Sequence, residues 1–84
     1  MDSVLVTIRL FGLLSEYDGP RQFEVEAKTL REALSRAADM GVDKDQVNGA
    51  LIYINGRALT GARRLSRRLH NGDELALLSP AGGG

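Results

Sequence analysis

Short runs of apolar residues, several of them alternating with polar ones, predict β-strands in this chain, because successive side chains of a strand point to opposite faces. Residues 4–11 form the clearest run. Its predicted core face carries Val4, Val6, Ile8 and Leu10, and its other face carries Leu5, Thr7, Arg9 and Phe11. Further strands are predicted at residues 22–26, 51–54 and 74–78, with a short return strand at 57–59.

Residues 29–40 change to a helical period. Apolar side chains recur there at helical spacing, in the order Leu30, Ala33, Leu34 and Ala37. Thr29 and Glu32 form a capping-box pattern, in which the hydroxyl binds the amide of residue 32 and the glutamate binds back to the amide of Thr29. Gly41 is expected to close the helix. One helix with one apolar stripe covers one face of a sheet, so the other face should stay more exposed.

The segments between these elements carry turn chemistry. Asn55-Gly56 is a strong hairpin signal, and Asp18-Gly19-Pro20 and Asn71-Gly72-Asp73 predict tight turns. Residues 12–17 are read as a turn or short 3₁₀ helix, and 42–49 as a loop with room for one helical turn. The segment 63–69 should be irregular or briefly helical, anchored by Leu65 and Leu69.

The order strand, strand, helix, strand, short strand, strand describes an α+β chain of the β-grasp type. We expect a mixed sheet of about four to five strands with one main helix packed on one face. The first and last strands should lie parallel in the middle of the sheet. Residues 1–78 are predicted to form the domain, and residues 79–84 a flexible glycine-rich tail.

Composition narrows the class of protein. The 84 residues are enough for one domain, and they include no cysteine that could form a disulfide or act as a thiol nucleophile. The formal net charge is zero, which argues against general nucleic-acid binding. No apolar run is long enough to span a membrane and no signal-peptide pattern is seen, so we expect a cytoplasmic protein with no membrane partner.

The charges are nevertheless unevenly distributed. Residues 1–47 hold six Lys or Arg and nine Asp or Glu, whereas residues 48–84 hold five Arg and two acids. Most of the second group lies in one segment, as Arg63, Arg64, Arg67 and Arg68. These side chains are suited to steer docking toward an acidic partner, and the alternative is a plain solvated basic segment.

The sequence ends in Ser79-Pro80-Ala81-Gly82-Gly83-Gly84. Proline ends the last strand, and the glycines have no Cβ, so this segment can pass close to the backbone of another protein. Its last group, the α-carboxylate of Gly84, is then an unhindered acyl group on a thin tail. The alternative reading is a frayed terminus without a role.

No catalytic set of side chains stands out elsewhere. His70 is the one histidine, and its place beside Asn71-Gly72 suits a turn residue better than a general base. Asp43 and Asp45 lack the further oxygen ligands of a calcium site, so no metal site is predicted. The chain is therefore expected to bind no cofactor and to rely on partners for catalysis.

Several segments resemble the ubiquitin-like sulfur carriers of molybdopterin and thiamine biosynthesis, and most of all the small, sulfur-carrying subunit of molybdopterin synthase. The matching segments are residues 10–16, 29–34, 54–56 and 69–80, followed by the terminal glycines. Two positions depart from the family pattern: Ser79 stands where a proline is frequent, and Gly82 where a larger residue is common.

The resemblance implies a reaction sequence. An E1-like adenylating enzyme would use ATP to activate the Gly84 carboxylate, and a sulfur donor protein would convert it to a thiocarboxylate. The tail, with Pro80, Ala81, Gly82 and Gly83, would then enter the active site of the large subunit of molybdopterin synthase. The resemblance also places a partner interface at Phe11, Ala58 and Leu78, and Tyr53 joins it as an outward residue of an adjoining strand.

Other functions remain open on the sequence. The chain could carry sulfur for thiamine or another pathway. The same tail would suit a ubiquitin-like protein modifier, joined through Gly84 to lysine side chains. A non-catalytic β-grasp interaction module is the third alternative, in which the glycines have no role.

Overall fold

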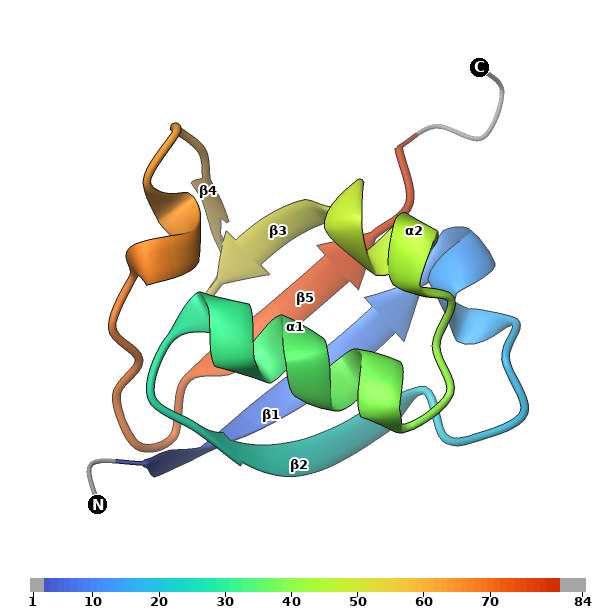
Figure 1. The fold of residues 1–84 in the computed structure, drawn as a ribbon, viewed down its shortest axis with the longest axis horizontal. Coiled ribbons are helices and arrows are strands. Elements are labelled where there is room, and N and C mark those ends of the chain that lie inside the picture. Colours follow the sequence, from blue (N-terminus) through green and yellow to red (C-terminus); the bar gives the residue numbers. More distant parts are fainter. Residues whose placement is uncertain (1–2, 81–84) are drawn as a thin grey trace.

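The computed structural model describes residues 3–80, and it forms one five-stranded mixed sheet with a main helix across one face (Figure 1). The strands are β1 (Val4–Phe11), β2 (Gln22–Ala27), β3 (Leu51–Ile54), β4 (Arg57–Leu59) and β5 (Glu74–Leu78). Their order across the sheet is β2-β1-β5-β3-β4. β1 and β5 are parallel and central, while the other neighbours pair antiparallel. The predicted β-grasp fold is confirmed.

The main helix, α1 (Leu30–Asp39), packs its apolar stripe onto the sheet. A five-residue helix, α2 (Lys44–Asn48), forms within the segment read as a loop, and 3₁₀ helices occupy η1 (Gly12–Ser15) and η2 (Arg64–Ser66). The largest fully buried side chains belong to Val6, Ile8, Leu14, Leu30, Val47, Leu75 and Leu77. Burying this core stabilises the fold and leaves the far face of the sheet uncovered.

The start of α1 differs from its predicted cap in one bond. The Thr29 hydroxyl accepts a hydrogen bond from the Glu32 amide at 3.3 Å, as predicted. The Glu32 carboxylate, however, accepts from the amide of Lys28 at 2.6 Å, where the sequence pattern predicted Thr29. Thr29 forms an isolated antiparallel bridge with Arg68. The bridge holds the chain just before the helix. The Glu32 carboxylate thus caps the amide one residue earlier than predicted.

A small polar network fixes the start of β5. Asp73 is 8% exposed, and its carboxylate accepts from the His70 amide at 2.8 Å and from Asn55 Nδ2 at 3.0 Å. Asn55 Oδ1 accepts in turn from the Glu74 amide at 2.9 Å. Asn55 has a positive φ of 52°, which asparagine tolerates better than most residues. The β3–β4 turn is thus tied to the first residues of β5.

This network also sets the ionisation of Asp73. Burial by itself raises the pKa of the Asp73 carboxyl. The hydrogen bonds from His70 and Asn55 outweigh that effect, and the nearby charges of His70 and Arg67 add to them. The pKa of Asp73 therefore lies below its usual value, and the carboxylate is ionised at neutral pH.

Candidate functional site

The face of the sheet opposite α1 carries two rows of side chains at the end where β5 leads into the tail. Strand register places Phe11, Leu78 and Leu51 side by side in the row nearest the tail. The next row runs Arg9, Ala76, Tyr53 and Ala58. The four residues predicted as a partner interface, Phe11, Tyr53, Ala58 and Leu78, therefore lie on one face of adjoining strands.

Leu51 was missed by the sequence reading. Its side chain is 50% exposed, and Phe11 is 46% exposed, so both large apolar groups meet water. Leu51 lies two residues before Tyr53, and the period of two along β3 places both on the open face. That alternation was the available signal. We define the apolar patch as Phe11, Leu51, Tyr53, Ala58 and Leu78.

The apolar patch is hollowed. A hollow of about 310 Å³ is lined chiefly by Phe11, Tyr53, Ala76 and Leu78. Arg9 and Glu74 form an ion pair of 3.8 Å at its rim, and both side chains are about half exposed. Surface-exposed apolar side chains with a charged rim are typical of protein interfaces, where a partner covers the centre and water reaches the rim.

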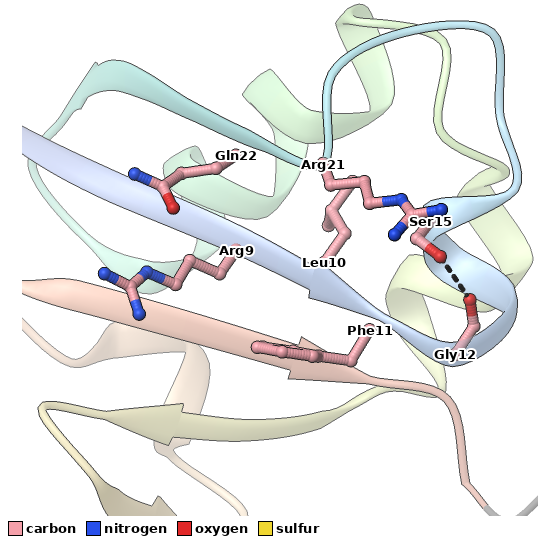
Figure 2. Close-up of a pocket in the computed structure, with 7 residues that line it drawn as sticks. All are labelled: Arg9, Leu10, Phe11, Gly12, Ser15, Arg21 and Gln22. Atoms are coloured by element: carbon pink, nitrogen blue, oxygen red, sulfur yellow. Dashed lines mark hydrogen bonds between the residues drawn. The ribbon is translucent and has the colours of Figure 1, made fainter.

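Phe11 also borders a second hollow, of about 320 Å³, between the ends of β1 and β2 (Figure 2). Arg9 lines both hollows, and Arg21 and Gln22 make this second hollow more polar than the one in the apolar patch. Figure 2 shows Phe11 at the end of β1, just before the chain turns at Gly12. A partner that covers the apolar patch therefore meets polar groups on the β2 side of Phe11.

The first residue after β5 is held by a side-chain hydrogen bond. The half-buried Ser79 accepts from the Leu13 amide through its Oγ, at 3.0 Å. Gly12 has a φ of +66°, and a Cβ at this position would collide with that hydroxyl. Ser15 Oγ donates to the Gly12 carbonyl at 2.7 Å and closes the same turn (Figure 2). η1 thus fixes the position of the chain directly after β5.

Of the predicted tail, Pro80 is exposed, and Ala81, Gly82, Gly83 and Gly84 lie outside the described residues. His70 is 79% exposed at its side chain, and its Nδ1 lies 4.0 Å from the Asp73 carboxylate. Its position beside the Asn71-Gly72 turn agrees with the predicted turn role. Within residues 3–80, no cluster of His, Asp or Glu is suited to hold a metal ion. No helix in this part of the chain is long and apolar enough to cross a membrane.

The five-stranded mixed sheet with one main helix places the chain in the class of ubiquitin-like β-grasp proteins. The model of the ThiS family matches residues 8–84, and the chain belongs to that family. It therefore has the fold of a ThiS-type, ubiquitin-like sulfur carrier. No curated protein is a significant match by sequence.

Solved structures agree on the fold. One similar structure is the complex of subunits 1 and 2 of molybdopterin-converting factor from Helicobacter pylori, at 28% identity and a TM-score of 0.67 over 96% of this chain and 100% of that one. Small archaeal modifier protein 1 from Haloferax volcanii is also 28% identical, with a TM-score of 0.69 over 95% and 99% of the two chains. The same-named protein from Methanosarcina acetivorans has a TM-score of 0.78 at 23% identity, covering 98% of both chains.

Proposed function

We propose that the chain is a sulfur carrier that works as the small subunit of a molybdopterin synthase in the cytoplasm. The observation that carries this proposal is the family match, which runs from β1 through the terminal glycines to Gly84. The similarity to subunit 1 of the Helicobacter pylori complex supports the choice of pathway.

The chemistry requires two activation steps. A Gly84 carboxylate oxygen attacks the α-phosphorus of ATP and displaces pyrophosphate, which gives an acyl-adenylate. A sulfide equivalent from a sulfur donor protein then attacks the acyl carbon and displaces AMP, which leaves a thiocarboxylate. The first step overcomes the low electrophilicity of a carboxylate, because AMP is a far better leaving group than oxide.

The carrier supplies the acyl group, and its partners supply the catalytic groups. An E1-like adenylating enzyme would bind ATP, and the synthase large subunit would provide the donors that stabilise the transferring group. The apolar patch is suited to dock these partners, because it includes Leu78, the last residue of β5, and therefore lies next to the start of the tail. Docking the body first would place Gly84 within the partner's active site.

A ubiquitin-like protein modifier is the second candidate. The observation that favours it is the 28% identity to small archaeal modifier protein 1 from Haloferax volcanii. In that function the activated Gly84 carbonyl would form an isopeptide bond with a lysine amine of a target protein, instead of accepting sulfur. Both candidates need adenylation, so they differ only in the nucleophile.

Intact-mass spectrometry separates the candidates. The full chain is incubated with the adenylating enzyme of the same organism, ATP and sulfide, and the variant that lacks Gly84 is the matched control. A carrier gains the mass of one sulfur in place of one oxygen, and the shortened variant does not. A ladder of conjugates in cell extract would instead support a modifier. An unchanged mass, with full binding by the shortened variant, would support a passive interaction module.

A further inference from the structure

A second charged surface lies away from the apolar patch. We define the arginine surface as Arg57 of β4 together with Arg63, Arg64 and Arg67 of the segment around η2. None of these four guanidinium groups forms an ion pair within residues 3–80. Like charges so close together repel one another unless an anionic group lies between them. The arrangement therefore favours an acidic ligand.

The arginine surface is shaped as well as charged. A hollow of about 470 Å³ is lined by Arg63, Arg64 and Arg67 with the intervening loop. An adjoining hollow of about 420 Å³ is lined by Arg57 and again by Arg67, and Leu59 borders both. Arg57, Arg63 and Arg67 are exposed, so a ligand in these hollows can reach their side chains.

Strand register places the two surfaces on opposite sides of the sheet. Arg57 pairs with Ile54, whose side chain is buried on the α1 side. Ala58 pairs with Tyr53 and lies on the open face, within the apolar patch. The helix η2 also packs beside α1, as Figure 1 shows with η2 in orange. Ala58 also borders the hollow of Arg57, so the two surfaces meet at β4. A partner on the apolar patch leaves the hollow lined by Arg63, Arg64 and Arg67 accessible.

We propose that the arginine surface is a second docking site, which binds an extended acidic segment of a protein while the apolar patch is occupied. β4 is an outer strand of the sheet, so a peptide in the adjoining hollows can also run along its edge. Aromatic side chains, on which the bases of single-stranded nucleic acid stack, are missing from the residues that line both hollows. Apolar groups such as Leu59 and Ala62 line them instead, which suits a peptide.

The test uses the full chain and a fluorescent oligoglutamate peptide at about 150 mM salt, where long-range attraction is largely screened. The double variant Arg63→Glu/Arg67→Glu is compared with the control Arg21→Glu/Arg31→Glu, which changes net charge equally at other exposed sites. We expect the first variant to weaken peptide binding about tenfold or more, and the control less than about twofold. Amide shifts on peptide addition should map to residues 57–67.

Three results would overturn the proposal. Equal weakening by both double variants would mean that only net charge attracts the peptide. Shifts centred on the apolar patch would place the peptide on the other face. Tighter binding of an oligouridine RNA to the same residues would make this a nucleic-acid surface. Because Phe11 lies in the apolar patch, Phe11→Asp should leave peptide binding unchanged, and this readout does not depend on sulfur transfer.

Discussion

The two ends of β5 differ in how they are held. At the start of the strand, Asp73 is buried and accepts two hydrogen bonds, and Asn55 bonds to the amide of Glu74. At the other end, Leu78 is half-buried on the open face, and Ser79 is held through one side-chain bond to the Leu13 amide. The start of β5 is thus tied by hydrogen bonds to the β3–β4 turn and to the loop around His70, whereas its far end is held by a single side-chain hydrogen bond at Ser79.

This contrast suits the proposed function, in which β5 must keep its place while a partner binds beside its far end. The hydrogen bonds at the start of β5 anchor the strand between β1 and β3, so we expect it to keep its place when a partner binds beside Leu78. The end of β5 at Leu78 lies in the apolar patch, whose side chains are exposed to water. This exposure lowers the stability of the fold slightly but favours binding to another protein. A body that is already ordered loses little conformational entropy when it docks onto a partner.

The largest effect is expected from Phe11→Asp, which puts a charge into the apolar patch beside Leu78. We expect binding of the synthase large subunit to weaken about 100-fold, as for loss of an aromatic hot spot, while stability changes by less than about 0.5 kcal/mol. Calorimetric titration measures the affinity. The matched control is Leu5→Asp, because Leu5 is 43% exposed on the same face of β1 but far from the tail. Equal losses in both variants would contradict the patch.

Asp73→Ala tests the hydrogen-bond network at the start of β5. It leaves the His70 amide and Asn55 Nδ2 without their acceptor, so we expect the free energy of unfolding to fall by about 2 kcal/mol. Because the folded-state pKa of Asp73 is lowered, its ionisation stabilises the native state above the unfolded pKa of about 3.9. That contribution disappears as the pH falls through the folded pKa.

Urea unfolding across the acid range measures this effect. The wild-type protein should lose stability more steeply below about pH 4 than Asp73→Ala does, since the variant has no carboxylate to protonate at this position. Partner affinity of the folded variant should stay near that of the wild-type chain. If the free energy of unfolding varied with pH in the same way in both proteins, the ionised Asp73 would not stabilise the fold.

The smallest effect is expected at Ser79. Ser79→Ala releases the start of the tail from η1, and ordering one more residue on docking costs about 1 kcal/mol. The KM for the carrier in the adenylation reaction should rise about fivefold with kcat unchanged. Ser79→Thr should restore the wild-type KM, since its hydroxyl can accept the same bond. Ser15→Ala, which removes a hydroxyl from the same turn without touching Ser79, should not raise the KM.

The fold could be predicted largely from local signals. β1 and β5 follow from apolar residues that recur with a period of two and from the flanking turn residues, and the Asn55-Gly56 turn fixes the β3–β4 register. The bond from Lys28 to Glu32 was not predicted, because the capping-box pattern pairs the glutamate with the amide of Thr29.

The candidate site was predictable only in part. The family resemblance implied an interface at Phe11, Ala58 and Leu78, and the register of the sheet places Phe11 beside Leu78. Leu51 was overlooked, although it lies two residues before the outward Tyr53 and the period of two along the strand places both on the open face. The bond between Ser79 and Leu13 joins residues 66 positions apart, and no local pattern indicates it.

The central claim is that the Gly84 carboxylate is the group on which the protein works. The most direct measurement is ATP–pyrophosphate exchange by the adenylating enzyme of the same organism, with the full chain or with the variant that lacks Gly84. We expect carrier-dependent exchange with the full chain, and exchange at the enzyme's background rate with the shortened one. Equal exchange with both chains, or none with the full chain, would contradict it.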